Sequence, residues 1–349
     1  MKEEETENRR SSTIWLWVIG LVTVLLAVLA ALPMLKGELD FSSKEEHETR
    51  KTIKKALAKR YSRLSLPDTF TVEFRRVDNT WVSNAPVNDE DLIRLAEKES
   101  VDNLKVRESC LTAKGLEALL REPLVTLELH RQPVSPAIFP VIASLPRLER
   151  LSLRQTRGVS PAIEKLTGPH GLQSLNLEET DLDDDGLAHI CKTFPNLTSL
   201  QLGEDLRITT TGLQAISNLR KLQLIDLTGV PVDRQALRAI SENGKINRLC
   251  LDRCGITDDD LPALRSLPLY SLSLRRTNVS DRGLAGLSSM KSLKYVSVRG
   301  CKNVTEKGCA ALAKKLPGLT VVLVDRVGKR KKDRAIIESI MEENNMEEE

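Results

Sequence analysis

The sequence has few aromatic side chains, little excess charge and few cysteines, and each shortage excludes a class of protein. Phe, Trp and Tyr together account for 11 of the 349 residues, and six Cys are too few for a disulfide scaffold. The 52 Lys and Arg nearly balance the 49 Asp and Glu, so the net charge of +3 lacks the basic bias of a nucleic-acid-binding protein. At the same time, 40% hydrophobic residues are too many for a disordered chain.

Motifs that carry catalytic or metal chemistry are also missing from the sequence. There is no Gly-rich phosphate loop, no HExxH and no GxSxG. The four His are scattered along the chain, and Cys250 and Cys254 have no second ligand pair at zinc spacing. We therefore expect no enzyme activity, no cofactor, no metal and no small-molecule substrate.

Leucine, by contrast, is abundant and recurs with a fixed period. There are 56 Leu, and the pattern hxxLxL, where h is apolar, occurs ten times at intervals of 23 to 26 residues. The ten copies begin at Val101, Leu124, Leu148, Leu172, Leu197, Leu222, Ile246, Leu269, Leu293 and Leu319. Such regular spacing indicates an array of repeats rather than two ordinary domains.

Each repeat predicts one short strand followed by one short helix. The LxL alternation is typical of a strand with one buried face. Three positions after the last strand hydrophobe comes a small residue such as Cys254, whose side chain can satisfy backbone groups of a turn. Thr257 and Ser280 each follow an apolar residue and are predicted helix N-caps. Ser135-Pro136 and Ser160-Pro161 replace the acidic start of the helix, so those two helices should differ.

These repeats resemble the leucine-rich repeat family, and in particular its cysteine-containing, ribonuclease-inhibitor-like or F-box-receptor-like subtype. The resemblance covers residues 101–324, as in the repeat that begins INRLCLDRCGITDDDL at Ile246. It implies an α/β fold, a curved solenoid with parallel strands on the concave face and short helices on the convex face. It also implies a protein partner that binds the concave face, because F-box substrate receptors carry this repeat subtype.

The chain before the array contains a long apolar run. Residues 1–13 form a short N-terminal tail, and residues 14–35 contain no charge and are long enough to cross a bilayer as a helix. We predict a transmembrane helix that acts as a signal anchor and places the protein in the membrane as a single-pass protein. A cleaved signal peptide is the alternative. A count of Lys and Arg over about 20 residues on each side and a count of only those nearest the run favour opposite orientations, so the orientation of the repeats stays open.

The remaining segments are predicted from their charge and periodicity. Residues 36–65 indicate a basic juxtamembrane helix or linker. Residues 66–100 indicate an N-terminal cap of the array, with a strand at Val72 and Phe74 and a helix that begins near Asn88. Residues 101–324 form the leucine-rich repeat domain of nine to ten repeats, and residues 325–349 form a charged C-terminal tail.

The concave face is the predicted working surface, because side chains between and just after the strand hydrophobes point there. Acids gather in the middle repeats, whereas Arg and Tyr, which are enriched in binding hot spots, gather toward the C-terminal end. The candidate partner-binding residues are Asp226, Arg248, Asp252, Tyr270, Arg275, Arg276, Tyr295 and Arg299. Cys250 is expected to be an exposed thiol on the same face.

Together these features predict a membrane-tethered interaction scaffold that binds a protein partner and no nucleic acid. One alternative is an envelope structural or adhesion protein that has no dedicated high-affinity ligand. The other is a substrate-receptor-like adaptor that lacks an F-box, since residues 36–100 show no such segment.

Overall fold

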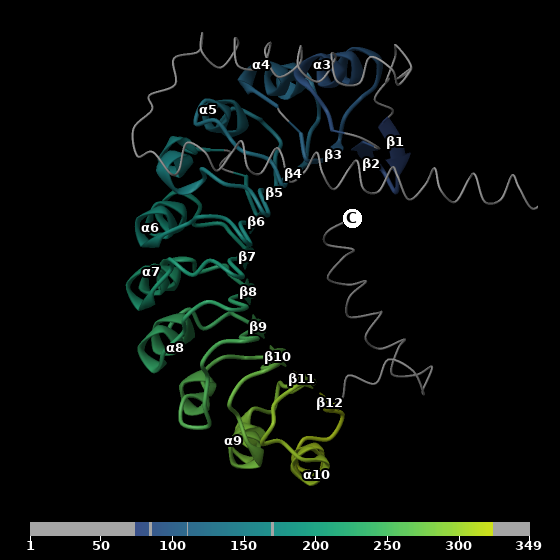
Figure 1. Ribbon diagram of the computed structural model, residues 1–349. Coiled ribbons are helices and arrows are strands. Elements are labelled where there is room, and N and C mark those ends of the chain that lie inside the picture. Colours follow the sequence, from purple (N-terminus) through teal and green to yellow (C-terminus); the bar gives the residue numbers. More distant parts are fainter. Residues whose placement is uncertain (1–73, 84–85, 110, 169–170, 324–349) are drawn as a thin grey trace, which may run out of the picture. The chain divides into compact units, whose positions relative to one another are not determined.

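The computed structural model describes residues 74–83, 86–109, 111–168 and 171–323 (Figure 1). All of them belong to one of the two units of the chain, Thr71–Glu349. Within this unit the strands form one sheet in chain order, from β1 to β12. The first two strands pair antiparallel, and every later neighbour pairs parallel.

The strands are short, and most contain three residues. Their bounds are β1 Phe74–Val77, β2 Thr80–Ser83, β3 Asn103–Arg107, β4 Thr126–His130, β5 Arg150–Ser152, β6 Ser174–Asn176, β7 Ser199–Gln201, β8 Leu224–Asp226, β9 Arg248–Cys250, β10 Ser271–Ser273, β11 Tyr295–Ser297 and β12 Thr320–Val322. One of these strands begins within two residues of the first residue of each of the ten hxxLxL patterns, as the repeat period predicts.

A layer of α-helices and short 3₁₀ helices lies on the outer side of the curved sheet (Figure 1). The α-helices are α3 Asp89–Lys98, α4 Ala113–Glu117, α5 Ile138–Ala143, α6 Asp184–Thr193, α7 Thr210–Gln214, α8 Arg234–Ser241, α9 Asp281–Gly286 and α10 Glu306–Lys315. The 3₁₀ helices are η2 Ala118–Arg121, η3 Ser160–Lys165, η4 Ala215–Asn218, η5 Leu261–Leu264 and η6 Leu287–Ser289. The predicted α/β repeat solenoid is therefore confirmed for the array, with strands inside and helices outside.

The core lies between the sheet and the helices and consists of the repeated hydrophobic positions. Within the repeat of β9, Ile246, Leu249 and Leu251 are at most 3% exposed. The small residues after the strands behave as predicted, because the Cys254 thiol lies 3.1 Å from the carbonyl oxygen of Leu227 in the preceding repeat. Such contacts satisfy carbonyl groups inside the stack, where water cannot reach them.

A second ladder of contacts joins the helix starts of neighbouring repeats. The Asp258 carboxylate accepts the backbone N–H of Ser280 at 2.7 Å and its hydroxyl at 2.5 Å, and Ser280 caps α9. A Cβ atom at Gly283 would overlap that carboxylate, which explains why glycine stands there. The same arrangement joins three other pairs of segments, through Asp89 with Thr112, Asp184 with Thr209 and Asp281 with Thr305.

The predictions about how individual helices begin are confirmed in part. Ser280 is an N-cap as predicted, but Thr257 is not. The Thr257 N–H and hydroxyl donate to the carboxylate of Asp260, and only the short helix η5 follows. The two Ser-Pro repeats do differ, since α5 has no side-chain cap and η3 is a 3₁₀ helix.

The N-terminal end of the array is closed by a hairpin and a capped helix. β1 and β2 form the antiparallel pair, and Phe74 lies in β1 as predicted, whereas Val72 lies outside the described residues. Asn88 caps α3 in a capping box, because it exchanges hydrogen bonds with Asp91 at 3.0 and 3.1 Å. These contacts fix the first helix against the first repeat.

The predicted membrane localisation is corrected. Residues 14–35 lie outside the described residues, as do the tails and the basic segment 36–65. Within the part of the chain that the structure describes, no helix is both long and apolar enough to cross a membrane. The single-pass membrane localisation is corrected on this finding, and the described residues give no support to the predicted transmembrane helix or membrane contact.

Candidate partner-binding surface

The parallel register aligns side chains of successive repeats into columns on the concave face. From β8 to β11 the central column contains Asp226, Cys250, Ser273 and Ser297. The column before it contains Arg248, Ser271 and Tyr295. Two residues after the central column come Asp252, Arg275 and Arg299. The structure thus brings six of the eight predicted partner-binding residues into three adjacent columns. The other two lie beside them, Tyr270 just before β10 and Arg276 one position after Arg275.

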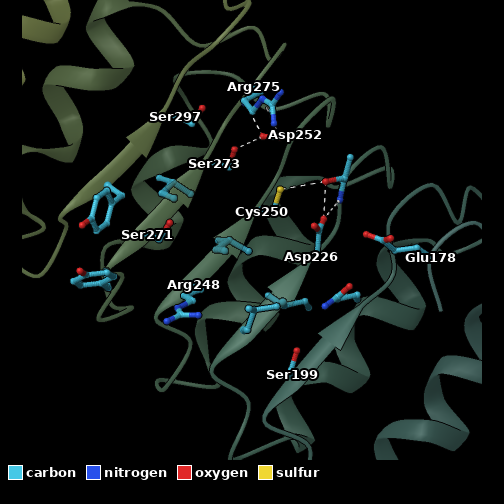
Figure 2. Close-up of a pocket in the computed structure, with 18 of the residues that line it drawn as sticks. Glu178, Ser199, Asp226, Arg248, Cys250, Asp252, Ser271, Ser273, Arg275 and Ser297 are labelled. Atoms are coloured by element: carbon cyan, nitrogen blue, oxygen red, sulfur yellow. Dashed lines mark hydrogen bonds and ion pairs between the residues drawn. The ribbon is translucent and has the colours of Figure 1, made fainter. Parts of the chain in front are cut away.

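These columns line a hollow of about 990 Å³ that extends from β5 to β12. All eight predicted residues line it, together with small Ser side chains that leave its floor open (Figure 2). Seven arginines and four acids line the hollow, and they are unevenly distributed. From β9 onward there are five arginines and only Asp252, whereas the half from β5 to β8 has two arginines and three acids. The C-terminal half of the hollow is therefore strongly positive.

Asp252 organises the centre of the C-terminal half. Its Oδ1 accepts the Ser273 hydroxyl at 2.5 Å and the Arg275 backbone N–H at 2.8 Å, and Figure 2 shows both converging on it. The Arg275 Nε lies 3.7 Å from Oδ2, while 43% of the Arg275 side chain remains exposed. Asp252 therefore positions Arg275 at the surface of the hollow without enclosing it.

Asp226 and Cys250 lie deeper in the floor. Thr228 donates to the Asp226 carboxylate from its N–H at 2.8 Å and its hydroxyl at 2.6 Å. Burial raises the pKa of Asp226, and the nearby charge of Asp252 adds to this in spite of the two hydrogen bonds. Burial, with the same two acids, also raises the pKa of the Cys250 thiol. The expectation of an exposed thiol is therefore wrong, because Cys250 is partly buried and lies 3.1 Å from the Thr228 hydroxyl.

Two tyrosines form an aromatic edge beside the arginines. The rings of Tyr270 and Tyr295 meet edge to face with their centroids 5.2 Å apart, and Tyr270 is 41% exposed. Tyr295 shares its column with Arg248, two strands away. A rigid aromatic pair next to guanidinium groups is the composition found at the energetic centre of protein interfaces.

Arg276 occupies a special backbone position that recurs in every repeat from β3 to β11. Nine residues in this turn column have positive φ, which side chains other than glycine rarely adopt. They are Glu108, Arg131, Gln155, Glu179, Glu204, Gly229, Arg253, Arg276 and Gly300. The two glycines make room for long neighbours: Glu204 reaches over Gly229 to pair with Arg253, and Arg276 lies over Gly300. Arg253 and Arg276 thus form the rim of the hollow.

Charges at the N-terminal end of the concave face are compensated within the array. Lys105 pairs with Glu128 at 2.9 Å, and Arg154 pairs with Glu178 at 3.0 Å. His130 lies 2.8 Å from the Ser152 hydroxyl, and burial together with the nearby Lys105 and arginines lowers its pKa to about 4. His130 is therefore neutral at pH 7, and this end offers a partner less excess charge than the C-terminal half.

The candidate list from the sequence missed three arginines of the hollow and one buried acid. The three arginines are Arg150, Arg154 and Arg253, which occupy the same columns as the predicted Arg248, Arg275 and Arg276 in other repeats. Asp205 stands in the turn column that holds Thr or Cys in five other repeats, and it is 1% exposed. Its position, three residues after the last strand hydrophobe, was the signal that could have identified it.

No protein-family model matches the chain. Over 129 residues the chain is 33% identical to "F-box protein MAX2 homolog B" of Petunia hybrida, and the match covers 34% of this chain and 18% of that protein. The chain thus spans less than a fifth of this relative. Among solved structures it aligns with a chain of the "Crystal structure of Rad7 and Elc1 complex in yeast", with a TM-score of 0.48, 15% identity and coverage of 94% of this chain and 96% of that one.

The local likeness to an F-box protein and the repeat geometry agree at the level of the array. The chain is a repeat solenoid with leucine at the repeated core positions, and part of it is similar to an F-box protein. Among the described residues, no group of His, Cys, Asp and Glu could hold a metal ion. That the chain is not an enzyme and needs no cofactor stays a prediction.

Proposed function

We propose that the chain is an interaction module that binds a partner protein in the hollow of its concave face. The observation that carries this proposal is the excess of arginine in the C-terminal half of the hollow, beside a tyrosine pair of which Tyr270 is exposed. Arginine and tyrosine supply most of the binding energy in protein interfaces, because each combines a large apolar surface with directed hydrogen bonds.

The dimensions of the hollow suit a polypeptide better than a small molecule. With neighbouring strands about 4.8 Å apart, the strands from β5 to β12 span roughly 34 Å, the length of about ten extended residues. Most of the residues that line it are polar or charged, whereas small-molecule pockets are lined mainly by hydrophobic and aromatic residues. Two tyrosines are too few to stack a run of bases, which argues against single-stranded nucleic acid.

The test uses the full chain to select binders from a displayed library of random peptides. Wild-type protein should enrich a consistent family of sequences. The double variant Arg275→Glu, Arg299→Glu should lose them, because each arginine at an interface centre contributes about 2 kcal/mol or more, a factor of about 30 in affinity. A milder variant, Arg275→Gln with Arg299→Gln, should weaken binding in the same direction.

The control reverses two exposed charges on the helical side. Arg238 lies on α8 and Arg265 directly follows η5, and both are exposed. Changing both to Glu alters the net charge by the same amount and should leave binding intact. Enrichment that survives the hollow variant, or is lost equally in both variants, would refute the proposed site. No enrichment at all would favour the alternative of a structural or adhesion protein without a dedicated ligand.

A receptor-type adaptor is the second candidate, favoured by the local likeness to an F-box protein. Here the hollow would select a protein, and another surface of the chain would hold a second protein. The hollow variant should then lose the first partner and keep the second. Loss of both, or the failure of any second protein to bind the wild-type chain, would exclude the adaptor role.

A further inference from the structure

The positive half of the hollow calls for an acidic occupant. From β9 onward the lining contains five arginines and one carboxylate, and Glu204 on the rim pairs with Arg253. The remaining excess of arginine makes this half positive, and the concave shape concentrates its field on the open floor. The floor itself is made of Ser271, Ser273 and Ser297, whose short side chains leave space above the strands and offer hydroxyl groups. An extended segment with several carboxylates fits this combination of depth, charge and hydrogen-bonding capacity.

The chain contains one such segment close to the array. Residues 335–349 include six Glu and no Lys or Arg. They directly follow residues 329–334, which carry five bases and one acid, so the charge of the chain changes sign at residue 335. Only the part after this point complements the arginines of the hollow.

The connection is long enough for this segment to reach the hollow. Eleven residues, 324–334, separate it from the last described residue, Leu323. Fully extended they cover about 36 Å at about 3.3 Å per residue. The distance across the sheet from β12 to β9 is three strand spacings, or about 14 Å. A tether of this length gives the segment an effective concentration on the order of 1 mM at the hollow.

We propose that residues 335–349 occupy the arginine-rich half of the hollow in the free protein and must be displaced by the partner. The proposal rests on the proposed function, because it concerns the same surface. It makes the concave face a site for acidic extended segments and makes partner binding competitive with a part of the same chain. The glutamates supply the carboxylates, and Ile336, Ile337 and Ile340 supply apolar surface for the tyrosine pair.

The test measures binding of a fluorescein-labelled peptide with the sequence of residues 335–349 by fluorescence anisotropy at low salt. Two full-length chains are compared: the wild type and a variant in which the six Glu of the segment are changed to Gln. For a peptide Kd of about 100 μM and an internal competitor at about 1 mM, the neutralised chain should bind about tenfold more tightly. Adding Arg275→Glu and Arg299→Glu to the neutralised chain should abolish binding, and adding Arg238→Glu and Arg265→Glu should not.

Equal peptide affinity for the two full-length chains, or no binding to either, would overturn the proposal. If sedimentation shows that the wild-type chain associates through this segment with a second copy, the occupant is intermolecular and the proposal is also wrong. Peptides selected from the library separate the two hypotheses. If the neutralised chain binds these peptides no better than wild type does, the hypothesis that residues 335–349 occupy the hollow is wrong and the proposed function stands. If neither chain binds them, the proposed function is wrong.

Discussion

Replacing Asp205 by Asn should make the stability of the array less dependent on pH between about pH 6 and pH 8. Asp205 is 1% exposed, and burial raises its pKa to about 8, with the nearby charges of Asp181 and Glu178 contributing. The hydrogen bonds agree with a protonated carboxyl group. The single hydroxyl hydrogen of Thr180 cannot serve both the Leu177 carbonyl at 2.9 Å and the Asp205 oxygens at 3.2 and 3.3 Å. A protonated Asp205 can donate to Thr180, which then donates to Leu177.

The sign and size of the change in the free energy of unfolding with pH follow from proton linkage. The folded chain keeps the proton on Asp205 up to about pH 8, whereas the unfolded chain releases it near pH 3.8. Stability from this group is therefore complete below pH 3.8 and is lost as the pH rises toward 8, by about 1.4 kcal/mol per pH unit. Between pH 6 and pH 8 the loss is about 2 kcal/mol, because half of the folded molecules have released the proton at pH 8. Asparagine keeps a hydrogen-bond donor and does not titrate.

The assay is urea unfolding of both full-length proteins at pH 6, 7 and 8. Equal m-values for the two proteins check that both undergo the same unfolding transition. The free energy of unfolding of Asp205→Asn relative to wild type should rise by about 2 kcal/mol from pH 6 to pH 8. Asp185→Asn on α6 is the control, because Asp185 is exposed and the same change of side chain is made there outside the core. A difference between Asp205→Asn and wild type that stays constant across this pH range would refute the reasoning.

Two further predictions concern the ladder of helix starts and the buried thiols. Gly283→Ala should lower the free energy of unfolding by about 2 kcal/mol or more, since its Cβ would displace the Asp258 carboxylate that holds the next N-cap. Gly286→Ala in the same helix should be neutral or stabilising in the same urea assay, because only one side-chain atom lies within 4 Å of its Cβ. In the folded protein at pH 8, iodoacetamide should modify Cys309 well before Cys254, which is buried with a pKa raised to about 12. Equal rates by mass spectrometry would contradict the burial argument.

The parts of the fold that could be predicted from the sequence are those that repeat a local rule. The LxL alternation selects a strand with one buried face, and a side chain such as Ser280 selects a helix start, wherever each occurs. The columns on the concave face could also be predicted, because the parallel strand register places equivalent residues of successive repeats side by side. Thr257 failed as a cap because Asp260, three residues later, accepts its hydrogen bonds in a turn instead.

Features that depend on a neighbouring repeat could not be predicted in the same way. The carboxylate of Asp258 explains Gly283 only when two repeats are stacked, since the two residues lie 25 positions apart. The pair of Glu204 and Arg253 spans two repeats across Gly229, so no single repeat contains its signal. The positive φ of the residues in this column is likewise a property of the turn between stacked strands.

The distribution of charge in the hollow restricts how an occupant can lie in it. Carboxylates of an occupant are favoured over β9 to β12, where arginines predominate, but they would meet Glu178 and the partly buried Asp226 over the earlier strands. Moving an acidic segment by a few strands would therefore replace attraction by repulsion, which costs more than the loss of a contact. An occupant that crosses the whole hollow must then change its charge along its length. This requirement fixes the direction and register of the occupant on a surface whose serine floor is otherwise nearly uniform. A uniformly acidic polymer does not meet the requirement, so recognition by the array differs from simple attraction of any polyanion.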